Sequence, residues 1–477
     1  MLFASLEFYL FFAAVLGVWG LAPAGWRHVV LLAASYVFYA WWLPWFSLIL
    51  LFCTLTSWLA GRAMADFPGG RRRKQIFIAA VAFNLLPLLF FKYFNFFSGS
   101  IHGLLSFGGW STTATYFDIL LPLGISFYTF QAVSYCADIY QRKIDAEPRF
   151  GTFALYLAFF PKLISGPIER GASLLPQLKK PAIFDGALFV SGIQLFLWGI
   201  FKKIVIAERL DMYVDMVFSD PGAVYGKTAV IGAWMFSLQI YCDFSAYMDM
   251  AIGCGRMFGI ELSRNFDFPY MARSIREFWR RWHITLTSWF RDYVYIPLGG
   301  NQATAGRWAF NIMLVFLLSG LWHGAAWTFV FWGGLHGLFY LTGKYTFSMR
   351  EQLRQRLKIT GRAASIMQVV ITFNLVSLAW VFFRAETIQD AFSLIRNMFI
   401  NLDLPVRMLS SQFSTALAFG FALVFVSTEL MMYWADRNNL NLVKMIPPVI
   451  RYPGYACGLL VMALFGVSSN EFIYFQF

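Results

Sequence analysis

The sequence predicts an all-α membrane protein that crosses the bilayer many times. Of its 477 residues, 59% are hydrophobic and only 13% are charged, whereas about a quarter of the residues in an average soluble domain are charged. Several apolar runs reach or approach the roughly 20 residues that a spanning helix needs. These runs show no alternation of apolar and polar residues, so they favour helices over a membrane β-barrel. Together with shorter candidates they predict about 11 transmembrane helices.

Seven apolar runs, spread along the chain, carry this prediction. They are Leu6–Ala22, Val29–Phe46, Ile76–Phe96, Thr228–Ile252, Phe310–Trp322, Ala364–Phe383 and Leu417–Met432. The first run lacks the basic stretch and the small-residue cleavage signal of a secretory peptide, so we expect it to be a retained helix. Arg62 and Arg71–Lys74 place the loop before Ile76 in the cytoplasm. Counting the spans backward from that loop predicts a periplasmic or exterior amino terminus.

We expect one membrane domain over residues 1–477, because no long linker rich in Pro, Gly or Ser divides the chain. Residues 1–115 have the pattern of plain hydrophobic helices. Between residues 117 and 340, Pro, Gly, Asp, Arg and His interrupt the apolar segments at positions that would be costly in lipid, so we place the catalytic core there. Leu121–Ser126 and Phe160–Pro167 each break a helix, which indicates a cavity lined by protein.

The remaining polar and charged features have simpler interpretations. The segment Thr346–Arg362 is predicted to lie on the cytoplasmic surface as an amphipathic segment, and the aromatic tail Phe472–Phe477 is expected at a membrane interface. The net charge of +13 fits cytoplasmic loops, so no nucleic-acid partner is expected. The five cysteines lie singly, without the spacing of a metal site or a disulfide framework, so no metal is expected.

Histidine is the side chain that exchanges protons most readily near neutral pH, and the chain has five. His323 lies at the end of an apolar run, between Gly320 and Gly324, where a polar ring is a functional hypothesis by default. The glycines would let a substrate or another backbone come close. The alternative is a packed histidine that donates a hydrogen bond to a neighbouring helix carbonyl. His336, also flanked by glycine, fits packing and function equally well.

A third histidine belongs to a predicted helix with a basic face. At helical spacing, three or four residues apart, this face carries Arg273, Arg276, Arg280, His283, Thr287 and Arg291. The opposite face carries Phe278, Trp282, Leu286 and Trp289, which we expect to meet lipid or neighbouring helices. A row of arginines beside a histidine suits a phosphate-bearing ligand. Anionic lipid headgroups or the positive-inside rule would explain the same arginines.

A polar cluster interrupts the apolar run Thr228–Ile252. It consists of Asp243, Ser245, Tyr247 and Asp249. Carboxylates within a span usually face the bundle interior and have a partner, which the segment with Arg276 and Arg280 could supply. We expect the two carboxylates mainly to fix the helix arrangement, with contact to substrate or to a histidine as the alternative.

Five motifs together resemble the membrane-bound O-acyltransferase family, and within it the alginate O-acetyltransferase (AlgI) branch. They are Leu121–Gln131, Phe159–Pro167, Asp243–Gly253, Phe278–His283 continuing through Tyr295–Gly300, and Gly320–Gly324. The resemblance implies a helical fold around a central channel, with re-entrant or amphipathic helices beside the spans. It matches His323 to the near-invariant histidine of the family and His283 to a second conserved one. Trp322, Arg276, Arg280 and Asp243 are our candidates for contact with substrate.

The resemblance further implies an enzyme of the bacterial inner membrane that takes acetyl from cytoplasmic acetyl-CoA and passes it to a periplasmic partner protein. That partner would place the acetyl on hydroxyls of alginate or a related exopolysaccharide, and no cofactor would stay bound. Acetylation of cellulose or peptidoglycan, or D-alanyl transfer to teichoic acid, would leave the same motifs.

A transporter without acyl chemistry is the competing class, since buried Asp, Arg and His also mark ion pathways. The broken helices lie in one region, without the two related halves of many transporters, which disfavours it. For acyl transfer we assign His323 as the base, and His283 to the thioester or to the acceptor.

Overall fold

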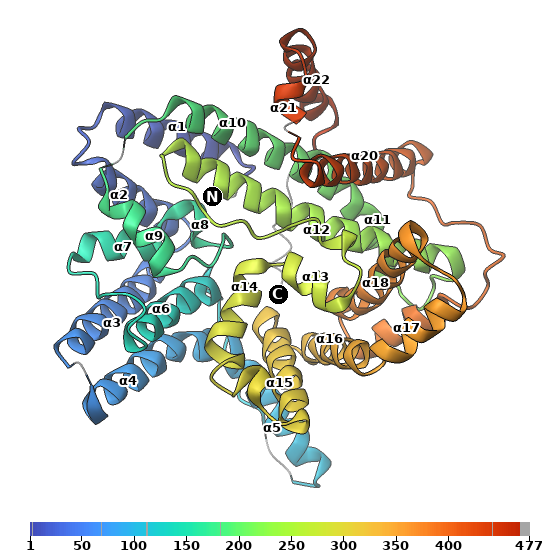
Figure 1. Cartoon of the computed structure of the whole chain (residues 1–477), viewed down its shortest axis with the longest axis horizontal. Coiled ribbons are helices and arrows are strands. Elements are labelled where there is room, and N and C mark those ends of the chain that lie inside the picture. Colours follow the sequence, from blue (N-terminus) through green and yellow to red (C-terminus); the bar gives the residue numbers. More distant parts are fainter. Residues whose placement is uncertain (2, 68, 111–112, 182, 441, 468–477) are drawn as a thin grey trace. The chain divides into compact units, whose positions relative to one another are not determined.

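The computed structural model describes residues 1, 3–67, 69–110, 113–181, 183–440 and 442–467, and in these residues it is helical throughout, without a strand (Figure 1). The prediction of an all-α fold is therefore confirmed. The aromatic tail Phe472–Phe477 lies outside the described residues. Two compact units, interleaved along the chain, make up the described part. The single domain and the central channel stay predictions.

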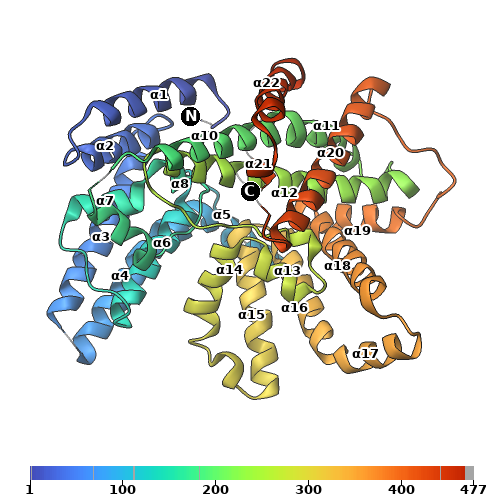
Figure 2. The ribbon, with the colours of Figure 1, turned by 45° about the horizontal axis from the view of Figure 1, so that its top comes forward.

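Unit 1 consists of Met1–Phe196, Met248–Arg264 and Ser288–Val294. Its own helices are α1 (Leu6–Leu21), α2 (Arg27–Ala40), α3 (Phe46–Asp66), α4 (Gly70–Leu88), the π-helical turn η1 (Leu89–Tyr93), α5 (Phe94–Phe107), α6 (Ile125–Tyr140), α7 (Phe150–Ala158), α8 (Phe160–Leu163) and α9 (Gly171–Lys179). Within this unit α3, α4 and α6 pack against one another, as Figure 2 shows. Four helical elements of the described residues contribute to both units, namely α10 (Gly186–Phe201), α12 (Gly226–Met257), α14 (Ile284–Phe290) and the π-helical turn η4 (Arg291–Tyr295).

Unit 2 consists of Leu197–Tyr247, Asn265–Thr287 and Tyr295–Phe477. Its helices are the π-helical turn η2 (Lys202–Ala207), α11 (Glu208–Phe218), the short η3 (Pro269–Met271), α13 (Ile275–Arg281), η5 (Gly300–Gln302), α15 (Ala305–His323), α16 (Trp327–Tyr345), α17 (Phe347–Arg356), α18 (Gly361–Arg384), α19 (Ile388–Asn397), α20 (Gln412–Arg437), α21 (Leu442–Met445) and α22 (Pro448–Phe465). α16 packs against α15, α13 and α18 (Figure 1).

Seven helical segments of the described chain are long and apolar enough to cross a membrane. They are Phe46–Asp66, Gly70–Phe107, Gly186–Phe218, Ala305–His323, Gly361–Arg384, Gln412–Arg437 and Pro448–Phe465. The shorter α1 and α2 are also apolar. These helices confirm a polytopic membrane protein, but they do not confirm the predicted number of about 11 spans. α12 forms as predicted around Thr228–Ile252 yet is absent from the seven, because residues such as Gln239 and Asp243 lower its mean hydropathy.

Both predicted helix breaks in unit 1 are present. α6 begins only at Ile125, directly after Gly124, whose φ of 72° is in the left-handed region. A Cβ at Gly124 would lie 2.4 Å from the carbonyl oxygen of Leu163, so the close approach also requires glycine. α8 is a single turn of four residues. α6 and α8 are both buried inside unit 1.

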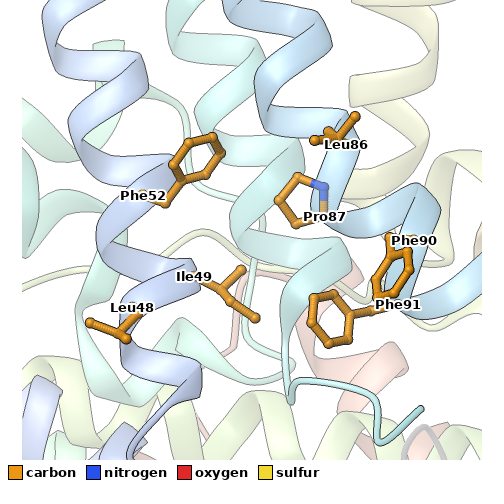
Figure 3. Close-up of a pocket in the computed structure, with 7 residues that line it drawn as sticks. All are labelled: Leu48, Ile49, Phe52, Leu86, Pro87, Phe90 and Phe91. Carbon is orange, nitrogen blue, oxygen red and sulfur yellow. The ribbon is translucent and has the colours of Figure 1, made fainter. Parts of the chain in front are cut away.

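Unit 1 also contains an apolar pocket of about 330 Å³ between α3 and the α4–η1 segment. Its lining residues are Leu48, Ile49, Phe52, Leu86, Pro87, Phe90 and Phe91 (Figure 3). Pro87 lacks a backbone N–H, and the helix continues past it as the π-helical turn. The pocket offers a ligand only apolar contacts, with no acid or base.

The predicted surface segment Thr346–Arg362 is exposed. α17 occupies most of it and has no buried residue. Arg350 donates hydrogen bonds to Thr346 and to the carbonyl of Gly343, and Arg354 donates one to Glu351. The amphipathic character of this segment and its place on the cytoplasmic surface stay predictions.

Candidate active site

The predicted basic helix is broken at its centre, so its arginines and His283 do not share one face. α13 ends at Arg281 and α14 begins at Ile284. Trp282 is extended, and His283 has a φ of 43°, in the left-handed region. Such a conformation costs a residue other than glycine about 1–2 kcal/mol. The prediction of one continuous helix is wrong because the tertiary structure, and not a local Pro or Gly, imposes this break.

The break separates exposed arginines from buried rings. Arg276 and Arg280 are exposed, whereas His283 is fully buried. The apolar side chains, which we expected to meet lipid or neighbouring helices, are all buried in protein; they are Phe278, Trp282, Leu286 and Trp289. Contact of Arg276 and Arg280 with a ligand would therefore take place at the protein surface.

The two predicted catalytic histidines lie close together inside unit 2. The ring centroids of His283 and His323 are 6.4 Å apart. Trp322 contacts both rings, with centroids 5.9 Å from His283 and 4.9 Å from His323. His323 ends α15 and is 3% exposed, whereas His283 is 0% exposed. Residues 40 positions apart in the sequence thus form one compact cluster.

Aromatic side chains enclose this histidine pair. Phe244 of α12 meets His283 edge to face, at a centroid distance of 4.8 Å. Trp332 of α16 and Phe383 of α18 meet His323 in the same way, at 5.0 and 5.4 Å. Such walls keep bulk water away, and electrostatic interactions between a histidine and a reacting group are stronger there than in water.

His336 packs in the wall of this cluster. The indole Nε1–H of Trp279 donates a hydrogen bond to His336 Nδ1 over 3.2 Å, so the proton of this neutral imidazole lies on Nε2. Trp332 lies 5.0 Å from His336 and also 5.0 Å from His323, between centroids. The sequence left packing and function equally open for His336, and these contacts favour packing.

The space beside the glycines that flank His323 is filled by Phe329 of the neighbouring helix α16, and not left open for substrate. A Cβ at Gly320 would lie 2.2 Å from the carbonyl oxygen of Phe329, and a Cβ at Gly324 would lie 2.1 Å from the Phe329 ring. On the facing helix, a Cβ at Gly333 would lie 2.3 Å from the carbonyl oxygen of Phe316. The backbones of α15 and α16 therefore touch, and this contact fixes the end of α15 where His323 lies.

The substitution Gly320→Ala should displace α15 from α16 and so misplace His323. We expect acyl transfer to fall by about 100-fold, because a displacement of about 1 Å can cost that much. Gly306→Ala, on the same helix with nothing within 4 Å of its Cβ position, is the matched control and should retain activity. Equal activity of the two variants would contradict the role of this helix contact.

Asp243 is buried in α12 and pairs with a lysine, not with the arginines predicted to meet it. Lys203 Nζ lies 2.8 Å from Asp243 Oδ1 and 2.9 Å from Glu208 Oε1. The neighbouring Lys202 donates a hydrogen bond to Ser245 over 2.7 Å. Arg276 and Arg280 cannot take this place because both are exposed.

Sequence reasoning missed Lys202 and Lys203, although two lysines inside an apolar run were a usable signal. Charged residues within a span are costly and are almost always paired. The pairing holds η2 and α11 against α12, whose Phe244 contacts His283. The interpretation of Asp243 as a residue that fixes helix arrangement is supported, and its contact with substrate stays a prediction.

No group of three or more His, Cys, Asp or Glu side chains that could hold a metal occurs within the described ranges. The five cysteines are free thiols, and four of them are buried. The imidazoles of the histidine cluster can transfer protons and form hydrogen bonds.

Burial lowers the pKa of His283 to about 3, from 6.5 for an exposed histidine. The unfolded chain therefore binds a proton below about pH 6.5 that the folded protein does not bind, so stability falls as the pH drops from about 6.5 towards 3. At about pH 5 this one group should lower the free energy of unfolding by about 2 kcal/mol.

The variant His283→Gln tests this pH dependence. The unfolding temperature of the wild-type protein in detergent should fall between about pH 7 and pH 5, and the fall should be smaller in the variant. An identical fall in both proteins would show that His283 is not buried as described.

Comparison with known proteins places these residues in a family. The sequence pattern of the membrane-bound O-acyltransferase family matches residues 142–385. A protein named "Probable alginate O-acetylase AlgI" from Azotobacter vinelandii is 38% identical over 84% of this chain and 78% of its own. The Pseudomonas putida protein of that name is 34% identical over 100% of both chains. A "Peptidoglycan O-acetyltransferase" from Helicobacter pylori is 34% identical over 77% of this chain and 73% of its own.

The matched range 142–385 contains both His283 and His323, the pair that unit 2 brings together. The similarity extends well beyond this range, as the alignment with the Pseudomonas putida protein shows. The predicted resemblance to alginate O-acetylases is confirmed, and the chain is an acyltransferase. It belongs to the membrane-bound O-acyltransferase family.

Proposed function

We propose that this chain transfers acetyl from cytoplasmic acetyl-CoA across the bacterial inner membrane for the O-acetylation of alginate or a related exopolysaccharide. A periplasmic acetyltransferase or acyl-acceptor protein receives the acetyl and passes it to the polymer. The observation that carries the proposal is the close approach of His283 and His323, 6.4 Å between ring centroids, inside an aromatic enclosure. The relatives named as alginate O-acetylases support acetyl as the acyl group.

His323 is the general base of the proposed reaction. The acceptor hydroxyl attacks the thioester carbonyl, a C–O bond forms, and the C–S bond breaks. An imidazole nitrogen of His323 takes the hydroxyl proton and returns it to the departing thiolate, which leaves as the free thiol of coenzyme A. His323 suits this role better than His283 because it retains 3% exposure while His283 has none.

His283 binds or polarises the thioester, or holds the acceptor. Its lowered pKa keeps the ring neutral at physiological pH, so it acts as a hydrogen-bond donor without a full charge. The acyl group passes directly from the sulfur of the donor to the hydroxyl oxygen of the acceptor, without an acyl-enzyme intermediate. Trp322, in contact with both imidazoles, would line this position.

Exposed basic side chains support cytoplasmic entry of the donor. Arg71, Arg72 and Lys74 are exposed at the start of α4, which favours the cytoplasm for this end of the helix and a periplasmic amino terminus. Arg276 and Arg280 are exposed on α13 and are available to the phosphates of coenzyme A or of membrane lipids.

Expression in an alginate-producing bacterium that lacks its own O-acetylase tests the proposal. We expect ester-linked acetyl on the secreted alginate to return, measured by hydrolysis and quantification of released acetate. A strain that instead gains acetylated peptidoglycan or cellulose, or D-alanyl esters, would redirect the proposal to that polymer. Normal membrane insertion with no acyl ester on any polymer would contradict it.

A further inference from the structure

The helix break at His283 is held from both sides by a short segment that precedes α13 in the sequence. Before the break, Asp267 N–H donates a hydrogen bond to the carbonyl of Arg281 over 2.9 Å. After the break, Ile284 N–H donates to the carbonyl of Asn265, also over 2.9 Å. The segment 265–267 therefore runs beside the broken chain and bridges the position of His283.

The side chain of Asn265 adds a second attachment. Its Oδ1 accepts hydrogen bonds from the backbone N–H and from the hydroxyl of Thr285, over 2.9 and 2.8 Å. Asn265 is 1% exposed, so these bonds form away from water. Loss of such an acceptor would leave buried donors of α14 unsatisfied, which is more costly than the net value of the bonds.

This arrangement replaces an ordinary helix cap. The residue before a helix commonly caps it with its own side-chain oxygen, and Ser, Thr, Asp and Asn are preferred there. His283 occupies that position before α14, and its imidazole has no oxygen to offer. Asn265 supplies the missing acceptor from another part of the chain, so the ring of His283 is not needed for capping.

We propose that Asn265 is a positioning residue for His283, which it holds in its left-handed conformation inside the aromatic enclosure by capping α14. The inference rests on the proposed function for the consequence in catalysis, but its structural part stands on its own. Local opening at a strained position is favoured once its supporting contacts are removed.

Chemical modification of histidine by diethyl pyrocarbonate tests the structural part on the full-length protein in detergent. Mass spectrometry follows His283 and, as an internal reference, the equally buried His336. In Asn265→Ala we expect His283 to react at least about tenfold faster while His336 stays protected. Asn265→Asp keeps an oxygen acceptor and should restore protection.

Two further variants make the test specific. Asn311→Ala removes another buried asparagine of unit 2, one that donates to the carbonyl of Leu298 over 3.0 Å, and should leave His283 protected. Thr285→Val removes one of the two donors to Asn265, and should expose His283 less than Asn265→Ala does.

If Asn265→Ala does not fold, the comparison of the other two variants decides. A faster reaction of His283 in Thr285→Val than in Asn265→Asp supports the proposal. Equal protection in these two variants, or parallel exposure of His283 and His336, overturns it.

A double-variant cycle tests the consequence for catalysis. Asn265→Ala should lower acetyl transfer in the wild-type background but have no additional effect in His283→Ala, because both changes remove the same group from its position. Additive losses would show that Asn265 acts on stability alone and overturn the positioning role. Exposure of His283 with undiminished acetyl transfer would support positioning by Asn265 and contradict the proposed role of His283.

Discussion

Replacement of His323 by alanine should abolish nearly all acetyl transfer while the protein still inserts and folds. General base catalysis contributes about 100- to 10,000-fold, so we expect a loss in that range. The alanine removes the only imidazole of the enclosure that retains exposure, and leaves His283 and the aromatic walls in place. Transfer from radiolabelled acetyl-CoA to the acceptor, in reconstituted membranes, measures the effect.

The control for this variant is His102→Ala, on α5 of unit 1. It removes a histidine from a plain spanning segment and should leave the rate within about twofold, as surface substitutions away from special features usually do. If His323→Ala transferred acetyl at the rate of His102→Ala, His323 would not be the base.

The second large effect concerns stability, and it follows from Lys203, one of the two buried lysines of η2. Lys203→Met leaves Glu208 and Asp243 close together without the cation that lies within 2.9 Å of both. Removal of one partner from a buried ion pair typically costs about 3–5 kcal/mol. We expect a loss of that order in the free energy of unfolding, measured by denaturation in mixed detergent micelles.

A second ion pair of α11 provides the comparison. Arg384 meets Asp215 at the surface, where the Asp215 side chain is 54% exposed. Arg384→Met should cost only about 0–1 kcal/mol, because exposed pairs contribute little. The combined variant Lys203→Met, Glu208→Gln, Asp243→Asn removes all three buried charges and should recover much of the lost stability. Equal stability of Lys203→Met and Arg384→Met would contradict the burial of the Lys203 pair.

Local chemistry in the sequence was sufficient for the breaks of unit 1. Gly124 permits the left-handed backbone before α6, and Pro161 has no N–H to donate four residues back, so α7 cannot continue unbroken into α8. The break at His283 has no such marker, because Arg281, Trp282 and His283 are all compatible with a helix. It depends on Asn265 and on the burial of the apolar face, and both are tertiary contacts.

The candidate site was predictable in its members but not in its geometry. The surroundings of His323 and the family resemblance singled out both histidines, yet neither spacing nor composition could place rings 40 residues apart in contact. The same limit applied to Asp243. Its position in an apolar run indicated a partner, but which cation met it depended on how η2 packs against α12. The glycines beside His323 indicated close approach, and only the fold identified α16 as the neighbour.

An electrophilic donor tests most directly whether the acyl carbon meets His323. A bromoacetyl thioester of coenzyme A carries a reactive carbon next to the carbonyl and should alkylate the group closest to the transferred acyl. Peptide mass spectrometry of the inactivated protein should find the adduct on His323, with protection by acetyl-CoA. Inactivation at the same rate with an unmodified His323, and an adduct on a residue outside the histidine cluster, would contradict the assignment of this site.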